Sequence, residues 1–352
     1  MTERLISADS HVRITSDSVR ERLSTKVAVQ YDDALQALAA EENELRGGQS
    51  FGLDSFELEG AKDPGYWEPH ARLAAMDRDG VEAEVLYSEL SAFRQFHLIP
   101  DDWKEVARAF NDCMSDFAGV NPKRLVCSYQ LPIIEIDYAV SEVERLAALE
   151  ARSVHLPNYP TELGFPDYYD ERYDPLWSAL SETGITISQH LGNKASMWDV
   201  FRRDPTPRKG IFTSLPAMML CENLAFWIMP GVLERFPKLK IAFVEPGITW
   251  FVYYLKQLDR MASAGSHYSF PGLSELPSTY FKRQMYLTFI GGVGLDLRHE
   301  VGIENVMWST DFPHPATSWP HSRETVEKAF VEIPADEREL MLSGNAARVY
   351  GL

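Results

Sequence analysis

Short apolar runs alternate with helix-like segments along the whole chain, and this alternation constrains the fold more than any other feature. We expect eight strands, which lie at residues 5–8, 83–87, 125–130, 153–156, 186–188, 240–244, 284–288 and 305–308. Most intervals carry helical patterns, such as the apolar stripe at every third or fourth position in residues 103–117. Alternating strands and helices predict a parallel sheet, and eight units indicate a closed (β/α)8 barrel. An open, doubly wound sheet would show the same local pattern and stays an alternative.

Residues 15–69 do not fit the count of eight units. They contain a helical pattern at residues 32–46, which Gly47 and Gly48 end, as glycine commonly does after a helix. Because this stretch follows the first strand, we interpret it as a helical insertion over the barrel mouth; a solvent-exposed connection is the alternative. The chain shows no internal repeat, low-complexity tract or linker, so we expect one domain over residues 1–352.

The charge balance excludes some classes of partner. Lys and Arg number 34 and Asp and Glu number 52, which gives a net charge of −18. Such an acidic surface repels phosphate groups, so we expect neither nucleic acid nor an anionic membrane as a partner. No apolar run approaches the about 20 residues of a membrane helix, and the N-terminus has no signal-like stretch.

The cysteines indicate a reducing compartment. The chain has three of them, Cys113, Cys127 and Cys221, which are far apart and lack any CxxC spacing. They form neither a disulfide framework nor a structural zinc site. We therefore expect a cytoplasmic protein.

Metal-type ligands stand at the ends of four expected strands. Asp9 and His11 follow the first strand, His190 follows the fifth, Glu245 the sixth and Asp311 the eighth. The chemistry of a parallel barrel gathers at the carboxyl ends of its strands, so we expect these side chains to meet at one rim. Buried carboxylates need partners, and a shared divalent cation would satisfy all of them.

Each of these residues also has a structural explanation when it is taken alone. His190 could be a hydrogen-bonded core histidine, and we expect a structural role for His155, which follows the fourth strand. Asp311 and Glu245 could cap the turns that follow them, and Asp9 could form a polar turn. The coincidence of four such strand ends favours a metal site over four separate caps.

Several motifs, in this order, resemble one family. They are DSH at 9–11, MDRDGVEAEVLY at 76–87, His190, FPKLKIAFVEPGITW at 236–250, STDFPH at 309–314 and GNAARVYGL at 344–352. The set is similar to the amidohydrolase-related family that includes aminocarboxymuconate-semialdehyde decarboxylase and resorcylate-type decarboxylases. The resemblance covers nearly the whole chain. It implies a distorted (β/α)8 TIM barrel with one divalent metal near the mouth, and it points to a homodimer.

The resemblance also implies roles for single residues. Asp9, His11, His190 and Asp311 match the family's metal ligands, and Asp311 matches an aspartate that also handles a proton. Glu245 stands where the semialdehyde decarboxylases have a histidine that assists a metal-bound water, which is the clearest departure. His314 has no firm equivalent; its position suits a group that orients Asp311 or meets the substrate.

Three functions fit this set of residues. The first is a metal-dependent hydrolase, in which Glu245 or Asp311 activates a metal-bound water and the metal or His314 stabilises the oxyanion. The second is a metal-dependent, non-oxidative decarboxylase of an aromatic or enoic acid; the third is a non-catalytic binding protein. We favour hydrolysis because a carboxylate at Glu245 is a reasonable base. We expect Zn²⁺ first, while Mn²⁺ and Fe²⁺ also suit mixed nitrogen and oxygen ligands.

The segment after the fifth strand bears on the substrate. Residues 201–210 include the basic side chains of Arg202 and Arg203, which could guide a small anionic substrate to the mouth. Trp198 could stack on a planar substrate. The structural alternatives are a solvated loop for the arginines and ordinary packing for the tryptophan.

Overall fold

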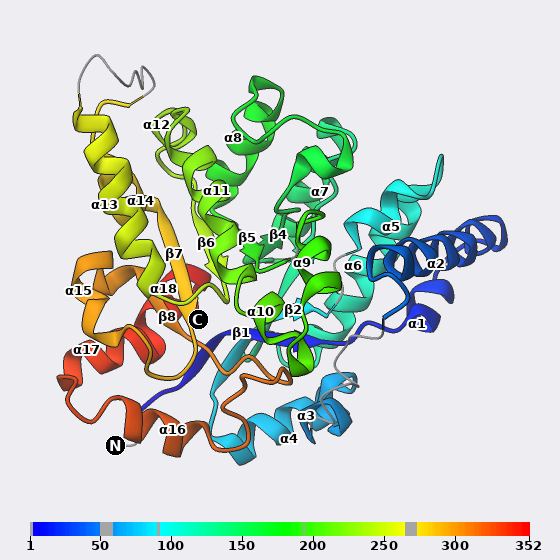
Figure 1. Ribbon diagram of the computed structural model, residues 1–352. Helices are drawn as coiled ribbons and strands as arrows, with labels where there is room; N and C mark the ends of the chain where they lie inside the picture. Colours follow the sequence, from blue (N-terminus) through cyan, green and yellow to red (C-terminus); the bar gives the residue numbers. More distant parts are fainter. Residues whose placement is uncertain (1–2, 50–58, 90–91, 193, 265–272) are drawn as a thin grey trace.

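Eight parallel strands in sequence order form the centre of the molecule, and helices surround them (Figure 1). The computed structural model describes residues 3–49, 59–89, 92–192, 194–264 and 273–352. The strands are β1 Ile6–Val12, β2 Ala83–Ser88, β3 Leu125–Gln130, β4 Ser153–His155, β5 Thr186–His190, β6 Ile241–Val244, β7 Met285–Phe289 and β8 Val306–Trp308. Each strand pairs in parallel with the next one along the chain.

The chain just after β8 closes the barrel against β1. The backbone N–H of Asp311 donates to the carbonyl of Asp9 at 3.0 Å, and that of His11 donates to the carbonyl of Phe312 at 2.6 Å. These bonds confirm the predicted distorted (β/α)8 barrel, whose register shifts within β1 between Ser7 and Ser10. β1 is longer than expected, so Asp9 and His11 lie inside the strand rather than beyond its end.

Helices fill the intervals between strands. They are α1 Ser16–Arg20, α2 Thr25–Leu45, α3 Glu59–Lys62, α4 Pro69–Asp79, α5 Phe93–His97, α6 Trp103–Gly119, α7 Ile136–Ala148, α8 Asp174–Thr183, α9 Met197–Arg203, α10 Gly210–Thr213, α11 Pro216–Ile228, α12 Val232–Arg235, α13 Thr249–Ser263, α14 Pro277–Gln284, α15 Arg298–Val301, α16 Ser322–Ala329, α17 Ala335–Glu339 and α18 Asn345–Tyr350. The apolar stripe predicted in residues 103–117 is the buried face of α6.

Among the described residues, two apolar cores contain barrel strands, and a third, small cluster joins α9 and α10. The larger one lies between strands and helices, as the parallel arrangement requires. The smaller one gathers inward side chains such as Ile6, Val85 and Met307 with Val349 and Tyr350 of α18. Lys240, just before β6, donates from Nζ to the carbonyl of Val349 at 3.2 Å, which ties α18 to the amino end of the barrel. Because α18 covers the amino end, the opposite, carboxyl end of the barrel is the one where the ligand-type residues can gather.

The segment after β1 contains a longer helix than its sequence pattern indicates. α2 begins at Thr25, not at residue 32, and Gly47 and Gly48 follow it with left-handed φ angles of 62° and 75°. The backbone N–H of Ser24, just before α2, donates to Glu105 of α6 at 2.6 Å. That this segment covers the barrel mouth stays a prediction.

One helical stretch, Pro207–Ile228, has the length and apolar composition of a membrane span. Arg208, Lys209 and Glu222 divide its residues into shorter apolar runs, and the sequence expectation concerned uninterrupted runs of about 20 residues. Its longest part, α11, is tied to the barrel: Trp227 donates from Nε1 to Gln189 of β5 at 2.7 Å. We therefore assign it to the helix layer that covers the strands.

Candidate metal centre

The four predicted ligands meet at the carboxyl end of the barrel. Nε2 of His190 lies 3.3 Å from Oδ1 of Asp9, and Nε2 of His11 lies 3.4 Å from Oδ1 of Asp311. One ligand atom each of Asp9, His11 and His190 fall within 4.8 Å of one another. Asp311 joins this group through its contact with His11, and one of its oxygens also lies within 4.8 Å of ligand atoms of Glu245 and His314.

Hydrogen bonding prepares His190 to bind a cation. Its Nδ1 atom lies 2.9 Å from the backbone carbonyl oxygen of Leu191, which can only accept a hydrogen bond. Nδ1 therefore carries a hydrogen whatever the charge of the ring, and Nε2 is the atom that faces Oδ1 of Asp9 and that a cation would bind after loss of its proton. A metal-binding histidine is commonly oriented in this way by its second nitrogen.

Buried polar atoms at this point lack hydrogen-bond partners among the described residues. They are Oδ2 of Asp9, both ring nitrogens of His11 and both carboxylate oxygens of Asp311. Leaving such groups unsatisfied costs roughly 1–3 kcal/mol each, and more when they are charged. A divalent cation bonded to these atoms removes that cost, so the residues fit a metal ion.

The electrostatics of the cluster also favour a cation. Burial and the nearby charge of Glu245 raise the pKa of the Asp311 carboxyl well above its ordinary value. Burial likewise raises the pKa of Glu245, although His190 opposes the shift. Burial, together with His314 and His190, lowers the pKa of His11. A cation bound here would offset the repulsion between the crowded carboxylates and would bind the neutral imidazole of His11.

The backbone is strained at two of these acidic residues. Glu245 and Asp311 have left-handed φ angles of 70° and 54°, which non-glycine residues seldom adopt. Each follows an apolar strand, and the backbone N–H of Glu245 is held by Oγ1 of Thr288 at 2.7 Å. Oε2 of Glu245 lies 4.0 Å from Nε2 of His190. Strain of this kind is typical of functional sites, so it supports the selection of Glu245 and Asp311.

His314 lies at the edge of the cluster beside Glu89, a residue that sequence reasoning missed. Nδ1 of His314 is 3.3 Å from Oδ1 of Asp311, and Nε2 is 3.2 Å from Oε2 of Glu89. Burial opposes protonation of His314, but Asp311 and Glu89 outweigh it and raise its pKa to about 10. Glu89 follows β2 directly. It lies two residues past the expected strand at 83–87, as His190 does past the strand at 186–188, so the strand-end rule applied to the second strand would have found it.

The predicted substrate-binding residues belong to a different cluster. Trp198 packs on Phe212, with ring centroids 5.5 Å apart, and the guanidinium of Arg46 lies over its ring. Arg202 pairs with Asp199 and donates to the carbonyl of Leu45 at the end of α2. Arg203 is exposed on α9. The contacts of Trp198 and Arg202 are thus with α2, α9 and α10, and a substrate role for these residues stays a prediction.

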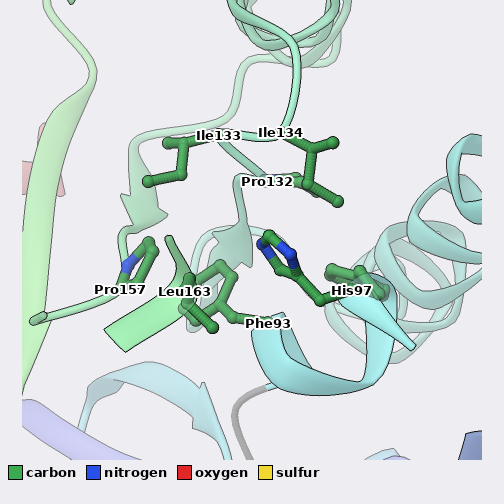
Figure 2. A pocket seen from close by; sticks show the side chains of 8 residues that line it. Phe93, His97, Pro132, Ile133, Ile134, Pro157 and Leu163 are labelled. Carbon is green, nitrogen blue, oxygen red and sulfur yellow. The ribbon is translucent and has the colours of Figure 1, made fainter. Parts of the chain in front are cut away.

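A small apolar pocket is linked to the metal cluster through Phe93 and His155. Figure 2 shows its lining, which comes from α5 and the segments after β3 and β4: Phe93, Phe96, His97, Pro132, Ile133, Ile134, Pro157 and Leu163. The ring centroid of Phe93 is 5.3 Å from that of His155, which is 6.3 Å from that of His190. Burial and His190 lower the pKa of His155 to about 3, so this histidine is neutral. Its Nδ1 lies 3.1 Å from Nε2 of Gln130, which suits the structural role expected of it.

Comparison with known proteins gives the family and several relatives. The family described as Amidohydrolase matches residues 8–352. The 2-amino-3-carboxymuconate-6-semialdehyde decarboxylase of Dictyostelium discoideum is 23% identical over 82% of this chain and 78% of its own length. The gamma-resorcylate decarboxylase of a Polaromonas species is 24% identical over 80% of this chain and 86% of its own.

A solved structure shows the same fold. The 5-carboxyvanillate decarboxylase of Novosphingobium aromaticivorans, complexed with manganese and 4-hydroxy-3-methoxy-5-nitrobenzoic acid, superposes with a TM-score of 0.74. The two chains are 18% identical, and the match covers 99% of this chain and 96% of that one. The family resemblance stated from the motifs is thereby confirmed.

These relatives overturn the preference for hydrolysis. Those named above are decarboxylases, which correspond to the second function in the sequence analysis. The error has a physical reason: a carboxylate at Glu245 that could take a proton from water can equally hold a proton for delivery to carbon. The ligand set is the same for both reactions, so it could not separate them. The relatives also favour an enzyme over a non-catalytic binding protein.

Proposed function

The chain belongs to the amidohydrolase family, and from that premise we propose that it is a metal-dependent, non-oxidative decarboxylase of an aromatic carboxylic acid. The observation that carries the proposal is the convergence of Asp9, His11, His190 and Asp311 at the carboxyl end of the barrel. The decarboxylases named above, which align with most of this chain, support the reaction class.

The proposed reaction exchanges CO2 for a proton. The bond between the ring carbon and the carboxylate carbon breaks, CO2 leaves, and a proton takes its place on the same ring carbon. Neither an oxidant nor a reductant is needed. A divalent cation held by Asp9, His11, His190 and Asp311 would supply positive charge to the carboxylate and a neighbouring oxygen of the substrate.

We assign delivery of the proton to Glu245. Its carboxylate borders the ligand cluster, and the left-handed backbone at its α-carbon turns it out of the line of β6. We assign the cation to the four other residues, which leaves Glu245 to hold a proton. Asp311 is the second candidate for this task, in line with the family resemblance.

We propose Mn²⁺ as the first choice of metal, ahead of the Zn²⁺ favoured by the sequence analysis. Two of the four ligands are carboxylates, and oxygen ligands suit Mn²⁺, while imidazole also suits Zn²⁺. The decarboxylase from Novosphingobium aromaticivorans binds manganese. Elemental analysis of freshly purified protein decides between the two ions.

We also propose that the substrate is a small anion and that the protein forms a homodimer. Arg202 and Arg203 are the candidates for attracting the anion, and Trp198 is the candidate for stacking on its planar ring.

The segment of residues 15–69 would cover the mouth, since the end of α2 contacts α9, which follows β5 on another side of the barrel. Light scattering after gel filtration tests the dimer.

The reaction is tested by CO2 release from gamma-resorcylate and 5-carboxyvanillate by the Mn²⁺-loaded protein. Reaction in D2O should place one deuterium on the ring carbon that lost CO2. Glu245→Gln should keep its metal and lose at least about 100-fold in rate, the usual scale for general acid catalysis. Asp311→Asn should abolish turnover without unfolding the protein. Full activity in both variants, or no CO2 from a panel of aromatic acids, contradicts the proposal.

A further inference from the structure

We propose that Glu89 is a positioning residue, which acts through His314 to fix Asp311 and His11 at the candidate metal centre. The inference rests on the proposed metal-dependent function, and it concerns a residue that is not itself a proposed metal ligand. It is argued from three contacts: those of Glu89 with His314, of His314 with the ligands, and of Glu89 with Tyr66.

Glu89 and Asp311 lie on opposite edges of the same imidazole ring. Nε2 of His314 faces both carboxylate oxygens of Glu89, at 3.3 and 3.2 Å. Nδ1 lies 3.3 Å from Oδ1 of Asp311, which is an ion-pair contact without the geometry of a hydrogen bond. Both ring nitrogens are therefore directed at carboxylates, and in this orientation neither is directed at a substrate. The ring transmits the position of Glu89 to Asp311.

The face of the same ring restrains a second ligand. The rings of His314 and His11 are stacked, with centroids 3.9 Å apart and planes 17° apart. Nδ1 of His11 lies 3.7 Å from Oε2 of Glu89, so this carboxylate borders both imidazoles. With His314 against its face, the His11 ring cannot rotate without displacing its neighbour.

Glu89 itself is held by the segment that follows β1. The side chain of Tyr66, in the short helical turn Pro64–Tyr66, is buried beside the Glu89 carboxylate, and burial together with the charge of Glu89 raises the pKa of its hydroxyl. The carbonyl of Tyr66 accepts from the backbone N–H of Arg13 at 2.8 Å, just past the end of β1. Residues from outside the regular barrel thus set the position of a carboxylate that borders two ligand residues.

Carboxylates that orient metal ligands from outside the ligand set have a measurable effect. Their loss typically lowers metal affinity or activity by about 10–100-fold, because the ligands lose their fixed orientation. We therefore expect Glu89→Gln, which keeps the size of the side chain and removes its charge, to weaken Mn²⁺ binding by about this factor. Tyr66→Phe should act in the same direction with a smaller loss.

The experiment measures Mn²⁺ affinity by electron paramagnetic resonance and the visible absorption of Co²⁺-loaded protein, which reports ligand geometry. The matched control is Glu82→Gln, since Glu82 pairs with Arg4 on the surface at the other end of β2. This control should bind both ions as the wild type does. Circular dichroism confirms that each variant is folded, and Tyr66→Phe replaces Glu89→Gln if the latter does not fold.

A double variant tests whether Glu89 acts through His314. If it does, Glu89→Gln combined with His314→Asn should bind Mn²⁺ no more weakly than His314→Asn alone. Independent, additive losses overturn the inference, as does a Glu89→Gln protein with unchanged Mn²⁺ affinity and Co²⁺ spectrum. Failure of the wild type to bind Mn²⁺ or Co²⁺ overturns both this inference and the proposed function. Metal binding that responds to Glu89, without CO2 release, overturns only the proposed reaction.

Discussion

Arg72 of α4 and Glu84 of β2 form a buried ion pair behind the metal centre, with Nε of Arg72 2.5 Å from Oε2 of Glu84. The same guanidinium donates from Nη1 to the carbonyl of His11 at 2.8 Å and lies over the ring of Phe312. One buried cation thus joins two strands of the barrel to the turn that carries Asp311. The position of the ligands depends on this pair as well as on their own strands.

Replacing Glu84 with leucine should destabilise the fold by about 3–5 kcal/mol, because it leaves the buried guanidinium of Arg72 without its countercharge. Glu82→Gln is the control, since its ion pair with Arg4 is about half exposed and contributes at most about 1 kcal/mol. Urea unfolding measures both. Equal midpoints for the two variants would show that the buried pair does not support the barrel.

Removing His190 should remove the metal. We expect about one divalent ion per chain in the wild type, and none after dialysis of His190→Ala, because two imidazole ligands become one. His321→Ala serves as the control, since this histidine is exposed and lies outside the cluster. Elemental analysis counts the ion. Equal metal content in the two variants would mean that the cluster around Asp9 is structural.

The fold and most of the candidate cluster could be predicted because both follow from periodic features of the sequence. Buried strands leave continuous apolar runs, and parallel strands bring their carboxyl ends together, so Asp9, His190, Glu245 and Asp311 could be grouped across 300 residues. Glu89 also follows an expected strand, at 83–87, and was missed because the rule was not applied to that strand. Tyr66 lies in a short turn without periodicity, and no local signal indicates its contact with Glu89.

Two further features, the directions of some side chains and the reaction class, could not be derived from the sequence. Position after β5 placed Arg202 and Trp198 on the side of the mouth, but α9 turns Trp198 toward α10 and both side chains toward the end of α2. Such directions depend on tertiary packing that a linear pattern does not contain. The choice between hydrolysis and decarboxylation depends on the substrate's reacting bond, which the ligand residues leave open.

Asp204 should anchor the basic segment after α9 in a pH-dependent way. Its carboxylate accepts hydrogen bonds from Thr206 and from the backbone N–H of Phe212 at 2.8 Å or less. Burial raises its pKa, but these bonds outweigh burial and lower the pKa to about 2, from an ordinary value of 3.8. The carboxylate therefore contributes stability above about pH 4, and this contribution is lost as the pH falls through 2.

Asp204→Asn should accordingly be less stable than the wild type at pH 7, and the difference should shrink as the pH approaches 2. Urea midpoints of both proteins across this range measure the difference. Asp199→Asn, on the exposed side of α9, is the matched control and should show no comparable trend. A constant difference at every pH would mean that the amide loses packing rather than charge.

Arg202 should link α2 to α9 rather than act by its charge alone. Its guanidinium donates to the carbonyl of Leu45, and its aliphatic part lies against Gly47, where a Cβ would come within 3.1 Å of Cδ of Arg202. Arg202→Ala should raise hydrogen exchange in residues 40–46 and 197–203, because both segments lose the same bridge. Arg203→Ala removes an equal charge from the neighbouring exposed position and should leave exchange unchanged. The prediction is contradicted if the two variants show the same hydrogen exchange, or if added salt abolishes the effect of Arg202→Ala. Either result would mean that the charge of Arg202, and not its hydrogen bond to Leu45, protects the two segments from exchange.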